Sequence, residues 1–319
     1  MRRIAVMTSG GDAPGMNSAV RAVVRSAVHR GVEVVGIRRG YFGLLGGEME
    51  PLGPESVHDI IHRGGTMLLT ARCAAFTEPE GERAGAARLR AAGVEGLVCV
   101  GGDGSLRGCL ALEGLGIPSV GIPATIDNDL AGTEQTIGFD TAVNTAVQAV
   151  DRVRDTAAAH ERTFVVEVMG RRSGFLALAV GMACGAETIL IPEVAWSPET
   201  VCRRLRRGLS RGLRQNLIVL AEGAGRATEL GAQIEASAGL ETRVTILGHV
   251  QRGGSPTAAD RNLSSRLGAA AVDFLVDGHH GLMAGLQAGV IVGVPLGAAV
   301  AGRRTLDLRL HELASRLSA

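Results

Sequence analysis

Lysine is absent from this chain of 319 residues, whose 33 basic side chains are all arginine. This absence excludes a Walker-type P-loop, because that motif needs a lysine on the β- and γ-phosphates of a nucleotide. Any phosphate that binds here must be held by arginine and by backbone N–H groups. The 32 acidic residues leave a formal net charge of +1, so the composition indicates no nucleic acid as a partner.

Paired cysteines and long apolar runs are also missing. No Cys-x-x-Cys occurs, and an odd number of cysteines in mostly apolar surroundings is typical of buried, reduced thiols in the cytosol. These cysteines are Cys73, Cys99, Cys109, Cys184 and Cys202. The apolar stretch after Met1 ends at Thr8, too soon for a signal peptide, and Val290–Ala301 is too short to span a bilayer. We therefore expect a cytoplasmic protein without a membrane segment.

The chain alternates between short β-branched runs and segments of helical periodicity. Its length and its 46% hydrophobic content favour two domains. The predicted strands are 4–8, 32–37, 96–100, 119–122, 163–168, 188–191, 217–221 and 242–247. The predicted helices are 16–30, 84–92, 106–115, 141–159, 174–184, 198–211, 229–238 and 258–276. This alternation predicts an α/β fold with doubly wound, mainly parallel sheets.

Three glycine-rich or polar turns follow predicted strands, at residues 9–15, 101–105 and 123–129. Ligands of doubly wound folds bind beyond the carboxyl ends of the strands, so the three turns are expected to converge on one edge. Asp127 and Asp129 project the same way in an extended segment, and Asp103 lies in the second turn. Mg²⁺ would reconcile these carboxylates with a phosphate, and the pattern therefore predicts phosphoryl transfer from a nucleotide.

Simpler interpretations exist for each of these motifs. Gly101–Ser105 also fits a plain tight turn or, with Gly108, a loose dinucleotide fingerprint, although Asp103 would then repel a pyrophosphate unless a metal intervenes. The turn at 9–15 fits a flexible loop, and Arg72 fits an ordinary surface charge.

Several arginines lie next to predicted strand ends and indicate a second anion site, because the guanidinium fork binds phosphate in a bidentate manner. They are Arg162, Arg171, Arg243 and Arg252. The alternative is that arginines are scattered over the surface of such a chain. His249 by itself fits a structural role, and Glu222, at the end of a strand, suits a sugar hydroxyl.

Five segments together resemble the bacterial ATP-dependent 6-phosphofructokinase family, and the resemblance extends to about Ala270. They are Thr8–Asn17 (TSGGDAPGMN), Gly101–Ser105 (GGDGS), Thr125–Asp129 (TIDND), Glu167–Arg171 (EVMGR) and Leu247–Pro256 (LGHVQRGGSP). The resemblance implies the two-domain phosphofructokinase fold, with residues 1–138 and about 251–301 binding ATP and Mg²⁺. Residues 139–250 and about 302–319 would bind fructose 6-phosphate.

The resemblance also implies roles for individual residues. Asp127 would be the catalytic base, Asp103 and Asp129 would bind Mg²⁺, and Thr125 and Arg171 would stabilise the transferred phosphoryl group. The ATP site would comprise Gly11, Arg72, Cys73, Gly102, Asp103, Gly104 and Ser105, with Gly11 and Arg72 also close to the chemistry. The sugar phosphate would contact Thr125, Ile126, Asp127, Met169, Gly170, Arg171, Glu222, His249, Val250, Gln251 and Arg252. Arg162 and Arg243 would reach it from a neighbouring subunit of a homotetramer.

ATP is favoured over pyrophosphate as the donor, since the pyrophosphate-using branch of the family has Asp and Lys where this chain has Gly104 and Ala124. A pyrophosphate- or mixed-donor enzyme is the main alternative. A silent regulatory subunit and a lipid or NAD kinase are others. The sequence departs from the family at Ala124, where Gly is usual, and at Phe175, where the family has Asp.

An effector site for ADP or phosphoenolpyruvate is implied in part. The matching residues are Arg21, Arg25, Arg154, Gly185, Glu187 and Arg211. Pro54, Leu213 and Gln215 replace basic residues that some or most members carry. We therefore expect weak control by these effectors.

Overall fold

The computed structural model describes residues 1–160, 162–212 and 215–318, and the chain forms two compact units. Unit 1 comprises Met1–Thr141 and Arg252–Arg304, and unit 2 comprises Ala142–Gln251 and Thr305–Ala319. The predicted breaks lie after residues 138, 250 and 301, whereas the units divide after Thr141, Gln251 and Arg304.

Unit 1 contains a seven-stranded sheet with the order β11-β10-β5-β4-β1-β2-β3. The five inner strands are parallel, and β3 and β11 pair antiparallel at the two edges. The strands are β1 (Arg3–Ser9), β2 (Glu33–Ile37), β3 (Met49–Leu52), β4 (Gly96–Gly101), β5 (Ser119–Pro123), β10 (Leu282–Gln287) and β11 (Val290–Pro295). The prediction of a mainly parallel α/β sheet is confirmed.

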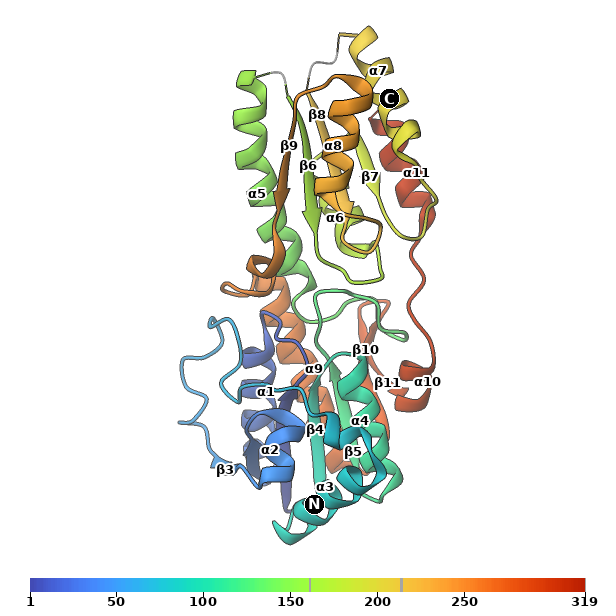
Figure 1. Ribbon diagram of the computed structural model, residues 1–319. Helices are drawn as coiled ribbons and strands as arrows, with labels where there is room; N and C mark the ends of the chain where they lie inside the picture. The colour runs from blue at the N-terminus through green and yellow to red at the C-terminus, as the bar shows by residue number, and fades with distance from the viewer. Residues whose placement is uncertain (161, 213–214, 319) are drawn as a thin grey trace. The chain divides into compact units, whose positions relative to one another are not determined.

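Helices cover both faces of this sheet, which is why β1 and β4 read as continuous apolar runs (Figure 1). On one face α1 (Met16–His29) packs against α9 (Ala258–Val276). On the other face Leu44, Leu89 and Leu106, all fully buried, belong to one core cluster. The helices of that face are α2 (Gly40–Gly46), α3 (Pro79–Ala91), α4 (Asp103–Gly114) and α10 (Leu296–Ala301), beside the short 3₁₀ turn η1 (Ala74–Thr77).

Unit 2 contains a parallel sheet of four strands with the order β7-β8-β6-β9. The strands are β6 (Thr163–Val168), β7 (Thr188–Leu190), β8 (Asn216–Ala221) and β9 (Thr242–Ile246). A core cluster on one face joins α7 (Pro198–Ser210) and α8 (Ala227–Ala238), while α6 (Phe175–Ala183) packs with α11 (Leu308–Leu317). The helix α5 (Phe139–His160) begins in unit 1 and continues into unit 2, and η2 (Gly248–Arg252) follows β9.

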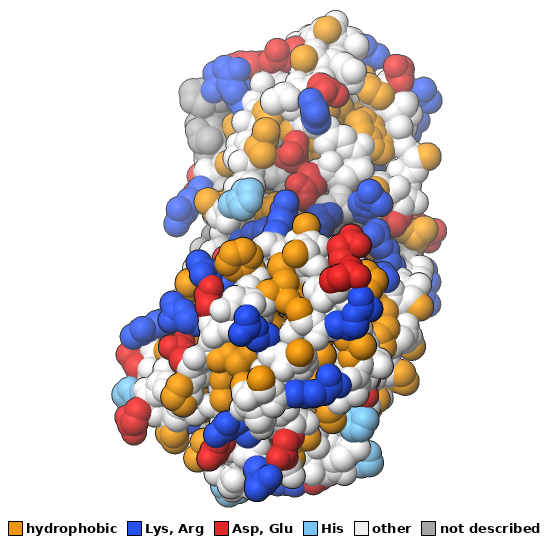
Figure 2. Space-filling model, turned by 60° about the horizontal axis from the view of Figure 1, so that its bottom comes forward, with side chains coloured by type: hydrophobic (Ala, Val, Ile, Leu, Met, Phe, Trp, Pro, Cys, Tyr) orange, Lys and Arg blue, Asp and Glu red, His pale blue; other side chains and the backbone are white. Residues whose placement is uncertain are grey.

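The cysteines are unpaired, and charged side chains of both signs lie at the surface. All five cysteines are unpaired thiols and four of them are buried, with burial raising the pKa of the Cys99 thiol to about 12. On the face drawn in Figure 2, arginine and acidic side chains are intermixed with apolar ones. Over the described ranges, no helix combines the length and the apolar character needed to cross a bilayer.

Candidate functional site

The three predicted turns lie side by side at the carboxyl edge of the unit 1 sheet. Strand β4 lies between β1 and β5, with Ser9 opposite Gly101 and Gly101 opposite Pro123. A Cβ atom placed on Gly10 would lie 3.0 Å from Oγ of Ser105, so the first two turns touch. The strand order reverses between β1 and β4, which is where doubly wound sheets bind their ligands. The predicted convergence is confirmed.

The first turn brings Gly11 against an arginine from a distant part of the chain. A Cβ atom on Gly11 would lie 3.0 Å from Nη1 of Arg252, so a larger residue would displace this guanidinium. Arg252 Nε is buried without a hydrogen-bond partner within the described residues. The exposed Arg72 lies near the same turn, because Thr70 Oγ1 donates to the Gly10 carbonyl at 2.6 Å. Two of the predicted arginines therefore flank this turn.

The third turn holds the predicted base in a fixed, buried position. Asp127 is 4% exposed, and its backbone N–H donates to Oγ1 of Thr125 at 3.2 Å. Asn128 has φ of 52°, in the left-handed region, and its Oδ1 accepts from the Thr136 N–H at 3.0 Å. Asparagine tolerates this conformation better than most residues. The turn thus presents Thr125 and Asp127 together, while Ile126 is buried.

The second turn begins α4 and carries the carboxylate of Asp103. Asp103 accepts from Nε and Nη2 of Arg107 at 3.0 and 3.1 Å, and it is about half exposed. Gly102 lies close to Thr125, whereas a Cβ atom on Gly104 would meet no atom within 4 Å. Asp129 is half-buried, and its carbonyl accepts from the Arg304 N–H at 3.0 Å. Cys73, also half-buried, packs against the core cluster of unit 1.

The oxygen donors of this edge match the preferences of a hard divalent cation. In the described part of the chain, no group of three or more His, Cys, Asp and Glu side chains could form a metal cage. Mg²⁺ does not require such a cage, since one or two carboxylates, water and substrate phosphates commonly complete its shell. Asp103 and Asp129 therefore suit an ion that arrives with a nucleotide.

In unit 2, the loop after β6 holds Arg171 in a strained conformation. Arg171 has φ of 51°, and the preceding Gly170 has φ of 134°, which side-chain-bearing residues rarely adopt. The Oε1 atom of Glu222 accepts from the N–H groups of Gly170 at 3.2 Å and of Arg171 at 2.7 Å. Glu222 therefore fixes the backbone of the loop in addition to any contact with a sugar hydroxyl.

Arg162 and Arg243 share a single acidic partner. They lie at the start of neighbouring strands, where Phe164 pairs with Arg243. Arg162 Nε lies 2.8 Å from Oε1 of Glu241, and Arg243 Nη2 donates to the same oxygen. These contacts, with the Arg162 hydrogen bond the largest, lower the pKa of the Glu241 carboxyl. A phosphate at this site would compete with Glu241 for the two guanidinium groups.

The segment after β9 contains residues of opposite exposure. His249 and Val250 are exposed, whereas Gln251 is fully buried and accepts from the Met169 N–H at 3.4 Å. Gln251 also donates to the Gly248 carbonyl at 3.0 Å. Met169 itself is 8% exposed. The side chain of Gln251 therefore fastens this segment to the end of β6.

The predicted effector residues are divided between the units. Arg21 and Arg25 lie on α1 in unit 1. In unit 2, Arg154 donates to the Gly185 carbonyl at 3.3 Å, Glu187 accepts from the Leu217 N–H at 2.6 Å, and Arg211 is exposed at the end of α7. Leu213 and Arg214 lie outside the described residues.

Three contributors were missed by sequence reasoning, namely Arg107, Glu193 and Glu241. Arg107 was detectable as an i, i+4 partner of Asp103. Glu193 acts across elements, and Glu241 pairs with Arg243 two residues away but with Arg162 only through the tertiary fold. Phe175 is buried at the start of α6, and Glu193 accepts from the Gly174 N–H at 2.8 Å. Glu193 thus supplies a carboxylate at the start of α6, where Phe175 stands.

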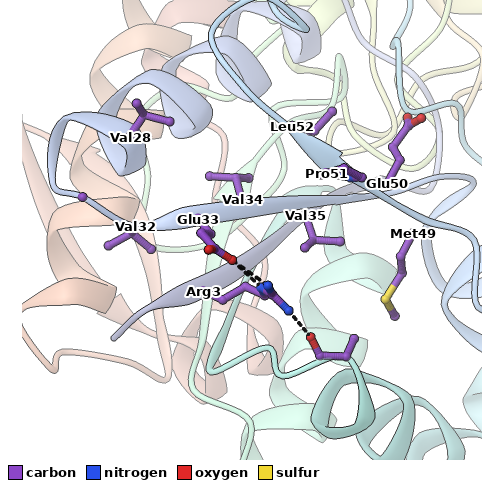
Figure 3. Close-up of a pocket in the computed structure, with 12 residues that line it drawn as sticks. Arg3, Val28, Val32, Glu33, Val34, Val35, Met49, Glu50, Pro51 and Leu52 are labelled. Carbon is purple, nitrogen blue, oxygen red and sulfur yellow. Dashed lines mark hydrogen bonds and ion pairs between the residues drawn. The ribbon is translucent and has the colours of Figure 1, made fainter.

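A separate pocket of about 650 Å³ lies near the amino ends of β1 and β2 (Figure 3). Its lining is mostly apolar, and Arg3 inside it pairs with Glu33 at 2.6 Å. The three turns lie at the opposite, carboxyl edge of the sheet. This pocket therefore does not belong to the candidate site.

Comparisons with known proteins agree with these observations. A family model described as phosphofructokinase matches residues 3–275. The chain is 54% identical over 318 residues to an ATP-dependent 6-phosphofructokinase of Bacillus mycoides and 52% identical over 318 residues to that of Shouchella clausii, and 100% of each chain is covered.

Solved structures of phosphofructokinases have a similar fold. Phosphofructokinase from Saccharomyces cerevisiae has a TM-score of 0.90 at 36% identity, over 99% of this chain and 47% of the yeast chain. This chain thus spans about half the length of the yeast chain. A pyrophosphate-dependent phosphofructokinase from Marinobacter aquaeolei has a TM-score of 0.87 at 22% identity, over 97% of this chain and 86% of the other, and shares the fold.

Proposed function

The chain belongs to the phosphofructokinase family, and we propose that Asp127 is its catalytic base. The reaction is the transfer of the γ-phosphate of ATP to the 1-hydroxyl of fructose 6-phosphate. The carrying observation is the convergence of the three turns at one sheet edge, with Asp127 only 4% exposed in the third. A carboxylate oxygen can accept the hydroxyl proton as the sugar oxygen attacks the phosphoryl group.

The polyphosphate of ATP is held mainly by backbone groups and arginine. We expect the N–H groups of Gly11 and Gly102–Gly104 to face it, and the start of α4 adds its helix dipole. The Ser105 N–H already donates to the Gly102 carbonyl at 3.0 Å, so Ser105 would contribute its hydroxyl. Arg72 lies beside the first turn, and Cys73 lines the same region. Phosphoryl transfer needs positioning and charge neutralisation more than covalent help, which suits a site with such groups.

Mg²⁺ is the proposed metal, held by Asp103 and Asp129. When bound, it neutralises charge on the phosphate oxygens of the nucleotide. The support is the pair of hard oxygen donors at the edge where the turns meet, without a protein cage in the described segments. Loss of activity on chelation, restored by added Mg²⁺, tests the assignment.

The proposed contacts of fructose 6-phosphate begin with unit 2. Met169, Gly170 and Arg171 provide the loop after β6, and Glu222 orders this loop. The other proposed contacts are Thr125, Ile126, His249, Val250, Gln251 and Arg252. Arg171 and Thr125 would stabilise charge on the transferred group, because the guanidinium fork and a hydroxyl both suit phosphate oxygens.

A homotetramer is the proposed active assembly, with Arg162 and Arg243 reaching the 6-phosphate of a neighbouring subunit. Ile246 and Val250, close to Arg243 in sequence, are 55% and 62% exposed, which favours a contact surface there. Light scattering checks the assembly. Mixing Asp127→Ser with Arg243→Ser subunits should restore activity, since some mixed sites would then contain both wild-type residues. No recovery in mixed tetramers would place Arg243 in its own subunit's site.

ATP is the phosphoryl donor, and the space around Gly104 is consistent with a nucleotide. Gly104 has open space where the pyrophosphate-using branch carries Asp, so a nucleotide can extend past α4. The deciding experiment measures fructose 1,6-bisphosphate formation with ATP and with pyrophosphate offered separately. We expect product with ATP alone, and product with pyrophosphate would contradict the assignment.

A further inference from the structure

Arg107 occupies both oxygens of the proposed metal ligand. Its Nε donates to Asp103 Oδ2 at 3.0 Å and its Nη2 donates to Oδ1 at 3.1 Å. The same Nη2 also donates to the Val300 carbonyl at 2.6 Å, at the end of α10. Asp103, the proposed Mg²⁺ ligand, therefore already pairs with the guanidinium of Arg107, and the Val300 carbonyl holds that guanidinium in place.

The local sequence explains this contact. Asp103 is the first residue of α4, where a carboxylate interacts favourably with the helix dipole, and Arg107 follows it at i+4 on the same face. Asp103 and Arg107 are 47% and 57% exposed. Ion pairs this accessible contribute little to folding stability, so opening this one costs little. The pair is therefore suited to opening when a better partner for each group arrives.

A metal–nucleotide complex provides such partners, whereas a metal ion alone does not. A free divalent cation would have to displace a guanidinium and then remain beside its positive charge. A nucleotide brings phosphate oxygens, which match the arginine fork. One helical turn, about 5.4 Å, separates Asp103 from Arg107, so both can contact ligands of one metal–phosphate group.

We propose, on the basis of the proposed metal role of Asp103, that Arg107 is a further nucleotide-binding residue of this enzyme. It holds Asp103 while the site is empty and moves to the phosphate chain when the metal–nucleotide complex binds. The site thereby selects the complex over the free metal ion. Arg107 therefore couples the two binding events: bound nucleotide strengthens metal binding, and bound metal strengthens nucleotide binding by the same factor.

Direct binding measurements on the full-length enzyme test the proposal. Free Mn²⁺ binding is measured by electron paramagnetic resonance, and MgATP binding by calorimetry without sugar phosphate. Arg107→Gln should bind free Mn²⁺ about tenfold more tightly, since a nearby positive charge is removed. It should bind MgATP about tenfold more weakly, since a charge-assisted hydrogen bond is lost.

Two further variants separate charge from geometry. Arg107→Lys keeps the charge and loses the fork, so free Mn²⁺ should bind as weakly as in wild type while MgATP binding falls. Arg83→Gln is the matched control, because Arg83 also forms an exposed helical ion pair in unit 1, with Glu80 at 2.9 Å. It should leave both affinities unchanged. Thermal unfolding of each variant checks that the fold is retained.

Asp103→Asn tests the metal assignment of Asp103 separately from the role of Arg107. If this variant binds Mn²⁺ and MgATP as wild type does, the metal assignment of Asp103 itself is wrong. If Asp103→Asn is defective while Arg107→Gln has wild-type affinity for both ligands, the metal assignment stands and the role of Arg107 is overturned. Opposite shifts of the two affinities in Arg107→Gln confirm it.

Discussion

The two units hold their candidate site residues in different ways. In unit 1 the important groups are fixed by backbone turns and burial, as in the 4% exposed Asp127 beside the left-handed Asn128. In unit 2 the candidate cations Arg162 and Arg243 share the carboxylate Glu241. Asp127 of unit 1 is therefore held by burial and backbone geometry, whereas Arg162 and Arg243 of unit 2 balance charge with Glu241.

This difference predicts different kinetic consequences. A change in a buried turn removes an interaction needed in the transition state and should lower kcat. A change among exposed charges alters the competition for a phosphate and should mainly alter KM. Substitutions in each unit therefore test whether kcat and KM respond in these two ways.

The largest effect is expected for Asp127→Ser. Removal of a general base typically costs about 10²- to 10⁴-fold in kcat, while the affinity for the sugar phosphate should change little. Asp127→Asn, which keeps the shape and removes the charge, should show a similar loss. Steady-state kinetics with varied fructose 6-phosphate measure both parameters. A near-normal kcat in either variant would remove Asp127 from the chemical step.

Gly104→Asp should raise the KM for ATP by about tenfold or more, because a carboxylate next to phosphate groups is repelled. A Cβ atom on Gly104 meets no atom within 4 Å, so the fold itself should tolerate the substitution. Gly297→Asp is the control, since this glycine of α10 is equally open. Unchanged ATP kinetics in Gly104→Asp would show that Gly104 does not face the nucleotide.

In unit 2 two neighbouring substitutions should act in opposite directions. Arg243→Gln removes a phosphate contact and should raise the KM for fructose 6-phosphate by roughly ten- to a hundredfold. Glu241→Gln removes the competitor and should lower this KM by up to about fivefold, the range of an exposed ion pair. The same kinetic titration measures both. A higher KM in Glu241→Gln would mean that Glu241 orders the arginines for binding.

Much of the parallel framework could be predicted, because buried parallel strands are apolar runs that end in recognisable turns. Strand β6 and helix α9 have the predicted bounds, Thr163–Val168 and Ala258–Val276. The hairpin of β10 and β11 was missed because its turn residues are Ala288 and Gly289, with φ of 47° and 80°, and not the Asn-Gly that such turns favour.

Other misses have their own causes. Helix α2 contains several glycines and has low helical propensity, so it depends on the burial of Tyr41 and Leu44. The start of α3 was predicted too late, although Pro79 followed by Glu80 and Glu82 is a recognisable helix start. At the site, the motifs located the turns, but contacts such as Glu222 with the Arg171 backbone depend on the tertiary fold.

The smallest effect is expected from the allosteric effectors. Arg154 and Glu187 already bind backbone groups of unit 2, so an effector must share or replace these contacts. Leu213 and Gln215 replace basic residues of the family, and each lost charge-assisted contact is worth about 1.5 to 3 kcal/mol, or roughly ten- to a hundredfold in affinity. An effector can shift an equilibrium only by its differential affinity for the two states, so a weakly bound one shifts little. Fructose 6-phosphate saturation should therefore hardly move with phosphoenolpyruvate or ADP at micromolar levels. A large rightward shift with phosphoenolpyruvate would show that Arg21, Arg25 and Arg211 suffice for tight binding.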